Sequence, residues 1–244
     1  MSSLQTQLAL VTGATRGIGF ETARQLASHG VHVLLAGRDR RKAVEASLKL
    51  QAEGLPVEAV ELDVTRSDSI AAAAQQVAQS HGKLDILVNN AGIALDRGVK
   101  ASNVSLQAWR QTFDTNLFGV VETTTAFLPL LRKSAAGRIV NVSSIVGSLA
   151  LNADPASPYY DFKLPAYNTS KAAVNAWTLQ LAYELRDTPI KVNSVHPGYV
   201  RTDMNDGQGE LDARDGARSS VMMALLDEGG PSGSFTYLGE VLPW

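Results

Sequence analysis

The chain has 244 residues, a formal net charge of −2 and no cysteine. This length suits one domain of alternating helices and strands. The near-neutral charge gives no long-range attraction to nucleic acid or to an anionic membrane, so we expect neither as a partner. The missing cysteines exclude disulfides, zinc–thiolate sites and thiol nucleophiles, and we expect no bound metal. Residues 1–7 lack the features of a targeting sequence, and no stretch is apolar enough to span a membrane, so we expect a cytoplasmic protein.

Short apolar runs alternate with helical patterns along most of the chain. Strands are predicted at residues 8–11, 31–36, 57–62, 84–88, 138–142 and 190–195. Helices are predicted at residues 20–29, 41–53, 67–81, 106–133 and 167–185. This alternation indicates an α/β fold: one domain over residues 1–244 with a Rossmann-type, doubly wound parallel sheet. The ligand crevice of such a sheet lies beyond the carboxyl ends of its strands. Residues at those ends are Gly13, Asp63, Asn89, Ser144 and Pro197.

A glycine-rich turn, residues 12–19, separates the first predicted strand from the first predicted helix. Glycines in this position let the backbone approach a pyrophosphate, whose charge is attracted by the helix N-terminus. The alternative is a plain turn without a ligand. The place between strand and helix favours dinucleotide binding.

Tyr167 and Lys171 are four residues apart at the start of a predicted helix, so they share one face and can reach one substrate. Alone, the spacing is more typical of a lysine stem packed beside a half-buried tyrosine. Tyr159 and Lys163 repeat the spacing, but the prolines around them exclude a long helix. We therefore choose Tyr167 and Lys171 as the chemically active pair.

Further short motifs occur in a specific order along the chain. They are Thr12 to Gly19, Asp63 with Val64, Asn89 to Gly92, Asn116, Ser143 with Ser144, Tyr167 with Lys171, and Pro197 to Thr202. Together they resemble the short-chain dehydrogenase/reductase family, over nearly the whole chain. The resemblance implies four catalytic residues, Asn116, Ser144, Tyr167 and Lys171. It implies that Tyr167 protonates a carbonyl oxygen as hydride arrives from a nicotinamide, that Ser144 hydrogen-bonds the same oxygen, and that Lys171 binds the ribose.

The resemblance also implies that Asn116 distorts its helix and holds a water in a proton relay to Lys171. From the residues alone, an exposed helical asparagine is the alternative. We expect the lysine cation to lower the pKa of Tyr167, because at ~4 Å and an effective dielectric constant of ~20 the attraction is ~4 kcal/mol. His196, which precedes Pro197 in a strand-end loop, is interpreted as structural and not as a general base.

The implied cofactor site combines residues from most of these motifs. Its members are Gly13, Thr15, Arg16, Gly17, Ile18, Gly19, Arg38, Asp63, Val64, Asn89, Ala91, Gly92, Tyr167, Lys171, Pro197, Gly198, Val200 and Thr202. Arg38 follows the second strand, where NAD-specific members carry an acid. A guanidinium there can bind a 2′-phosphate, and Arg16 could supply a second cation, so we predict NADPH. The alternative is that both arginines are solvated and that Asp39 pairs with Arg38.

Two segments depart from the usual family pattern. The interval between Ser144 and Tyr167 is longer than in most members, so residues 152–164 look like an insertion. Carbonyl-reductase subgroups, some of them monomeric, carry insertions here that cover the helix faces used for dimerisation elsewhere. We therefore expect a monomer or homodimer and not a tetramer. Residues 203–210 are expected to form a mobile loop, and residues 233–244 a last strand and short tail.

The predicted function is the NADPH-dependent reduction of a small-molecule ketone or aldehyde. One alternative is a 3-oxoacyl thioester reductase, which needs a basic docking patch for an acidic carrier protein. Another is a non-catalytic protein that binds a dinucleotide and regulates a partner, since a fold alone does not determine function. The presence of all four implied catalytic residues argues against the second alternative.

Overall fold

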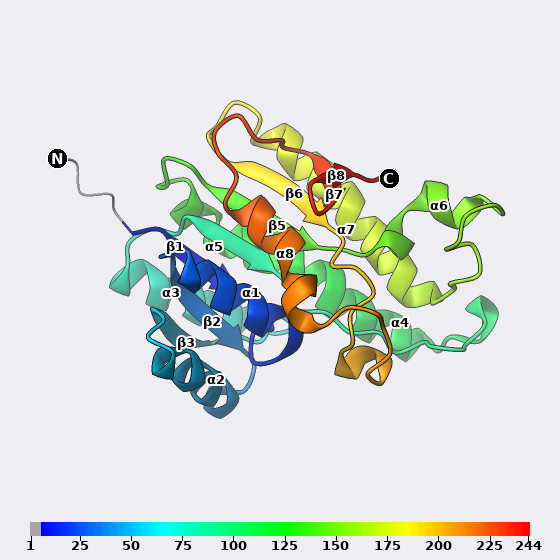
Figure 1. The fold of residues 1–244 in the computed structure, drawn as a ribbon, viewed down its shortest axis with the longest axis horizontal. Coiled ribbons are helices and arrows are strands. Elements are labelled where there is room, and N and C mark those ends of the chain that lie inside the picture. The colour runs from blue at the N-terminus through cyan, green and yellow to red at the C-terminus, as the bar shows by residue number, and fades with distance from the viewer. Residues whose placement is uncertain (1–5) are drawn as a thin grey trace.

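The computed structural model describes residues 6–244, so part of the segment considered above for a targeting function lies outside it. Within that range eight strands form one sheet in the order β3-β2-β1-β4-β5-β6-β7-β8 (Figure 1). All neighbouring strands pair in parallel except β7 and β8. The strands are β1 (Leu8–Val11), β2 (His32–Gly37), β3 (Val57–Glu61), β4 (Ile86–Asn89), β5 (Arg138–Val142), β6 (Lys191–Val195), β7 (Ser234–Tyr237) and β8 (Glu240–Val241). The predicted doubly wound α/β sheet is confirmed.

Helices cover both faces of the sheet, as Figure 1 shows. The longer helices are α1 (Gly17–Ser28), α2 (Arg40–Ala52), α3 (Ser67–Ser80), α4 (Leu106–Phe113), α5 (Gly119–Leu131), α7 (Pro165–Glu184) and α8 (Ala213–Ala224). The shorter ones are η1 (Ala101–Asn103), η2 (Asp114–Phe118), η3 (Ile145–Gly147), α6 (Leu149–Ala153) and η4 (Asp203–Asn205). One apolar core lies between the sheet and α1, α2 and α8, and the other between the sheet and α3, α5 and α7.

The first strand shows that the sheet is buried on both faces. Leu8 and Leu10 belong to one core, whereas Ala9 and Val11 belong to the other. Successive side chains of a strand point to opposite faces, so a strand covered by helices on both faces must be apolar throughout. The uninterrupted apolar runs in the sequence are thus the signature of the two-sided core.

The helix predicted over residues 106–133 is interrupted. It consists of α4, a π-helical turn η2, and α5, and Asn116 lies in the π turn, fully buried. The predicted distortion at Asn116 is therefore confirmed, and the single continuous helix is wrong. Single π turns inside α-helices are rare and frequently accompany functional sites.

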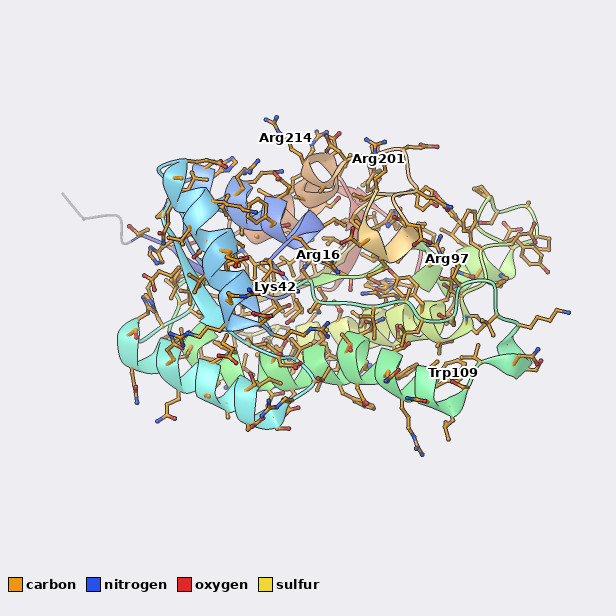
Figure 2. The ribbon with its side chains drawn as sticks, turned by 90° about the horizontal axis from the view of Figure 1, so that it is seen from below. Arg16, Lys42, Arg97, Trp109, Arg201 and Arg214 are labelled. Carbon is orange, nitrogen blue, oxygen red and sulfur yellow. The ribbon has the colours of Figure 1, made fainter. Side chains whose placement is uncertain are left out.

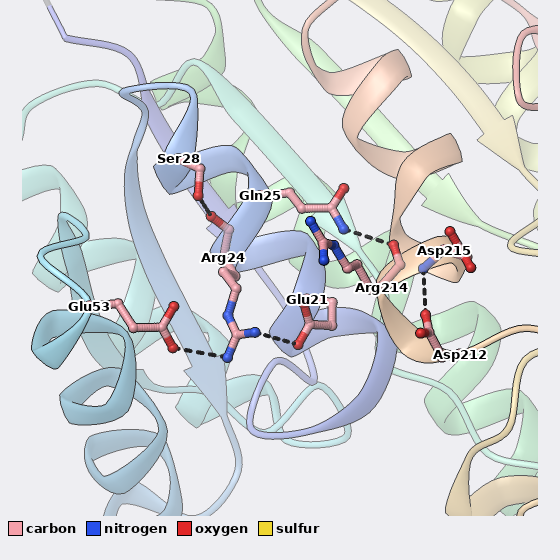
Figure 3. A network of polar contacts seen from close by, with 8 residues as sticks. All are labelled: Glu21, Arg24, Gln25, Ser28, Glu53, Asp212, Arg214 and Asp215. Carbon is pink, nitrogen blue, oxygen red and sulfur yellow. Dashed lines mark hydrogen bonds and ion pairs between the residues drawn. The ribbon is translucent and has the colours of Figure 1, made fainter.

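The sequence reading did not anticipate α8. Its buried side is mostly glycine, alanine and serine, so no stripe of large apolar side chains marks this helix in the sequence. The helix packs on α1, and polar contacts surround the junction (Figure 3). Gln25 Nε2 donates to the Arg214 carbonyl at 2.8 Å, and Asp212 accepts from the Asp215 amide at the start of α8. Arg24 on α1 forms an ion pair at 3.0 Å with Glu53, which directly follows α2.

The segment interpreted as an insertion contains the end of α6 and then a series of turns. The absence of a long helix around Tyr159 and Lys163 is thus confirmed. Tyr160 and Phe162 are exposed, so the segment contributes apolar surface of its own, while Tyr183 on α7 is exposed as well. The association state stays a prediction. No helix among residues 6–244 is long and apolar enough to cross a membrane.

Candidate active site

Helix α7 places Tyr167 and Lys171 on one face, next to the carboxyl end of β5. Lys171 is 4% exposed, and its Nζ donates to the Val142 carbonyl at 2.8 Å. The same Nζ lies 5.7 Å from the centre of the Tyr167 ring. A 20-residue helix that starts with a proline at its first position holds the pair in register.

Ser144 reaches this pair from the turn after β5. A Cβ atom at Gly147 would lie 2.8 Å from Lys171 Cβ, so only glycine allows the turn to lie this close to α7. The Ser144 side chain lies close enough to the Tyr167 hydroxyl to influence its pKa, whereas Ser143 Oγ donates to the Lys171 carbonyl. The second serine of the motif is therefore the one that meets the phenol, as the family pattern implies.

Asn116 ties the π turn to the segment after β4 and to α7. Its Oδ1 accepts from the Ile93 amide at 2.8 Å, and its Nδ2 donates to the Ile93 carbonyl at 2.9 Å and to Ser170 Oγ at 3.0 Å. A Cβ atom at Gly92 would lie 3.5 Å from both Asn116 Oδ1 and Lys171 Nζ. The four implied catalytic residues thus come together from η2, the turn after β5, and α7.

Burial controls the protonation of the central pair. The side chain of Tyr167 is partly exposed, but the protein packed around its hydroxyl raises the pKa to about 12, against the lowering effect of the Ser144 side chain. Burial lowers the pKa of Lys171 to about 8. The expected lowering of the Tyr167 pKa by the lysine is therefore wrong for the protein alone. The physical reason is that desolvation penalises phenolate and ammonium alike.

His196 binds the turn that carries Ser144. Its Nδ1 accepts a hydrogen bond from the Ile145 amide at 3.2 Å, and burial lowers the pKa of the imidazole to about 4. A ring that accepts at Nδ1 must be unprotonated there. This geometry agrees with the structural interpretation of His196.

The glycine-rich turn packs tightly against the segment after β4. Gly13 has a φ of +62°, and a Cβ atom there would lie 2.9 Å from Ala91 Cα. A Cβ atom at Gly19 would collide with Asn90 Nδ2, which donates to the Gly13 carbonyl. Thr12 Oγ1 accepts from the amides of Asn90 and Ala91 at 3.0 and 3.1 Å. Two motifs far apart in the sequence therefore pack against each other at the carboxyl ends of β1 and β4.

The N-terminus of α1 fits the pyrophosphate of a dinucleotide. Gly17 has a φ of +59°, and a Cβ atom there would meet nothing within 4 Å, so open space adjoins the turn. Among residues 6–244, no side chain caps the first amides of α1, and no acid lies in its first turn. Free N–H groups and the positive end of a helix dipole attract phosphate. Both the space and the donors that this group needs are present.

Arg38 and Arg16, the two arginines of the predicted cofactor site, lie near the glycine turn. A Cβ atom at Gly37 would collide with Thr15 Cγ2, so the glycine turn lies directly against the end of β2, next to the exposed Arg38. Asp39 caps α2 through the Lys42 amide at 3.1 Å. In the part of the chain that the structure describes, this carboxylate accepts from the Lys42 amide and forms no ion pair with Arg38.

Arg16 forms an ion pair with Asp203 of η4, and both side chains are mostly exposed. Figure 2 shows Arg16 beside the segment that carries Asp203. The guanidinium therefore already has an anionic neighbour on the far side of the crevice. Exposed ion pairs contribute about 0–1 kcal/mol, so a phosphate can displace this carboxylate at small cost.

The remaining cofactor residues of the prediction separate into two groups. A Cβ atom at Gly216 of α8 would lie 2.5 Å from Val200 Cγ2 and 3.4 Å from Ile18 Cγ1, so the loop after β6 and the start of α1 both lie beside α8. Thr202 forms a reciprocal cap with Asn205 within that loop. Pro197 and Gly198 belong to that loop, and Asp63 and Val64 follow β3, where Thr65 donates to Asp63 Oδ1 at 2.7 Å.

Asn89, another residue of the predicted cofactor site, lies in neither of these two groups. It is buried, and its Nδ2 donates to Thr124 and Asn141 at 2.9 Å, between the sheet and α5. Its predicted contact with the cofactor stays a prediction, and its observed contacts are those of a core amide.

One buried acid next to the site was missed. Asp96 is 1% exposed and accepts a hydrogen bond from the Ala166 amide, one residue before Tyr167. No local pattern marks it, because its partner is distant in the sequence.

Comparison with known proteins adds relatives of similar length. The model of the short-chain dehydrogenase family matches residues 7–212. The short-chain dehydrogenase anuI of Penicillium roqueforti is 39% identical over 96% of this chain and 94% of its own. A (+)-neomenthol dehydrogenase of Capsicum annuum is 34% identical over 97% of both chains. The structure of an NADPH-bound carbonyl reductase from chicken fatty liver matches with a TM-score of 0.86 and 30% identity, over 99% of this chain and 100% of that one.

Proposed function

The chain belongs to the short-chain dehydrogenase family, and we propose that it reduces a ketone or an aldehyde to the alcohol with NADPH. The observation that supports this most is the convergence of Tyr167, Ser144, Lys171 and Asn116 at the carboxyl ends of β4 and β5. A cytoplasmic location and a monomeric or dimeric state belong to the same proposal and derive from the sequence alone.

The proposed reaction needs a proton for the carbonyl oxygen. A Tyr167 pKa of about 12 keeps the phenol protonated near neutral pH, so it is ready to act as the acid in the reductive direction. Ser144 shares the oxygen through a second hydrogen bond, which stabilises the developing negative charge. The nicotinamide, when bound, supplies the hydride. Lys171, whose amine lies below the phenol, then serves as the group through which Tyr167 regains a proton.

Arg38 supports NADPH as the cofactor, and its substitution tests that choice. A guanidinium makes charge-assisted bonds of ~1.5–3 kcal/mol each to a 2′-phosphate, so Arg38→Asp should raise the Michaelis constant for NADPH about 10- to 100-fold or more. The constant for NADH should change little. Arg132→Asp, an equal charge change at an exposed site on α5's end, is the control and should leave both constants unaltered. Equal kcat/KM for NADPH and NADH in the unmodified protein contradicts the proposal.

The substrate that fits best is a bulky, mostly apolar ketone. Leu95, Leu149, Tyr199 and Met204 follow β4, β5 and β6, the strands whose ends carry the site, and all four are exposed. Apolar side chains that gather at a crevice are typical of a ligand-binding surface. The similarity to a neomenthol dehydrogenase points to cyclic ketones of this kind.

A substrate panel tests the reaction directly. NADPH consumption should be fastest with cyclic and aromatic ketones, and chiral analysis of the alcohols then gives the stereochemistry. Faster turnover of a carrier-bound 3-oxoacyl thioester than of any ketone favours the thioester reductase instead. NADPH binding without turnover on any carbonyl supports the non-catalytic alternative.

A further inference from the structure

The start of α7 is held by a residue from another part of the chain. Asp96, in the loop between β4 and η1, accepts a hydrogen bond from the Ala166 amide at 2.6 Å. Its side chain is buried and its other oxygen, Oδ1, has no hydrogen-bond partner among residues 6–244. A carboxylate is seldom buried unless a partner compensates for lost hydration. Here the compensation comes from the helix N-terminus, through a charge-assisted bond and the helix dipole.

The local sequence does not supply this cap. The residue at the N-cap position of α7 is Leu164, which offers no side-chain hydrogen bond, and Pro165 at the first helical position has no N–H. The Ala166 amide is thus the first donor of the helix that requires a partner outside it. Asp96 provides it from a segment 70 residues earlier in the chain.

The capped turn is the one that carries the phenol. Tyr167 directly follows Ala166, so the cap acts one residue from the proposed acid. The turns before α7 are exposed, and they reach this first turn through Asn168, whose Nδ2 donates to the Phe162 carbonyl at 2.8 Å in an exposed setting. The Asp96 bond is the buried one of the two, and exposed hydrogen bonds open more readily.

We propose that Asp96 is a positioning residue for Tyr167, which it serves by fixing the first turn of α7 against the loop that follows β4. The role rests on the proposed function, because Tyr167 is the acid of that reaction. Leu95, one of the apolar residues proposed to face the substrate, directly precedes Asp96 in this loop. The Asp96 hydrogen bond therefore holds the substrate-facing loop and the turn that carries Tyr167 together. Misplacement of a catalytic group by ~1 Å costs up to about 10²-fold in rate.

Kinetics of two substitutions at this position test the role. Asp96→Ala removes the cap, and kcat should fall about 10- to 100-fold while the dissociation constant of NADPH, measured by fluorescence, stays within twofold. Asp96→Asn keeps an oxygen that can accept from the Ala166 amide, and it should restore kcat to within a few-fold of the unmodified protein. An Asp96→Ala protein that folds, binds NADPH and retains its kcat overturns the proposal.

A matched control separates positioning from a general loss of stability. Ser105 caps α4 through the Ala108 amide at 3.1 Å, at an exposed helix start. Ser105→Ala should lower the melting temperature without lowering kcat. An equal fall of kcat in Ser105→Ala contradicts the specific role of Asp96. If Asp96→Ala does not fold, Asp96→Glu, which keeps the charge but lengthens the side chain, should still lower kcat about tenfold; an unchanged kcat overturns the proposal.

Hydrogen exchange gives a readout that does not depend on turnover. Amides 166–168 should lose protection in Asp96→Ala and keep it in Asp96→Asn. Unchanged protection in Asp96→Ala overturns the cap even if the protein reduces no carbonyl at all. A protein that shows the expected exchange but reduces no carbonyl contradicts the proposed function instead, so the two failures are distinguishable.

Discussion

The chain contains two Tyr-x-x-x-Lys segments whose environments are opposite. Tyr167 and Lys171 lie in a 20-residue helix, and the lysine is buried with its amine on a main-chain carbonyl at the end of β5. Tyr159 and Lys163 lie in turns, and the lysine is exposed. Identical spacing in the sequence therefore leads to one pair that shares a helix face and one that does not.

The exposed pair uses its lysine for local contacts. Lys163 Nζ lies 4.7 Å from the centre of the Tyr160 ring and donates to the Asn152 carbonyl at 2.9 Å. Water surrounds such a cation, so its contacts are worth about 1 kcal/mol or less. The comparison teaches that a motif acquires chemistry from the backbone that holds it and from the loss of water around it.

Phenylalanine substitutions at the two tyrosines should show the largest difference between the two segments. Tyr167→Phe should lower turnover by at least about 10²- to 10⁴-fold, because it removes the proton donor, while NADPH binding is retained. Tyr159→Phe should leave turnover within twofold. Steady-state kinetics with one good ketone decides the matter. If Tyr159→Phe is inactive and Tyr167→Phe is active, the choice of Tyr167 and Lys171 as the catalytic pair is wrong.

Methionine substitutions at the two lysines test how the burial of each lysine affects the pH dependence of stability. Burial lowers the pKa of Lys171 from 10.5 to about 8, so between these values the unfolded chain binds a proton that the folded chain does not. The free energy of unfolding should therefore rise with pH from 8 to 10, by roughly 2–3 kcal/mol. Lys171→Met should remove this rise, and Lys163→Met should keep it, in denaturant titrations at pH 8, 9 and 10. The same rise in both variants contradicts the assignment to Lys171.

One buried and one exposed histidine allow the same comparison of stability at acid pH. Burial lowers the pKa of His196 to about 4, so below pH 6.5 the unfolded chain binds a proton that the folded chain refuses. Stability should fall from pH 7 to pH 5, and His196 should account for about 2 kcal/mol of that fall. His196→Gln, which can still accept from the Ile145 amide, should flatten the profile by this amount. The exposed His29→Gln is the control, and an equal flattening there rules out the explanation.

Much of the fold followed from local patterns. The first strand is apolar on both faces, and glycines recur between β1 and α1, where a dinucleotide-binding fold has its phosphate-binding turn. Even the break in the helix at Asn116 was foreseeable from the family motif. Helix α8 buries mostly small residues and few large apolar ones, which is why that helix was not foreseen.

The environment of the site was decided by contacts between distant segments. Asp96 meets Ala166, Arg16 meets Asp203, and Gly147 lets the Ser144 turn lie against α7. A pKa depends on how much water all neighbours together displace, and those neighbours come from separate strands and helices. The order of motifs along the chain thus identified Tyr167, whereas its raised pKa and its cap arose only when the sheet brought those segments together.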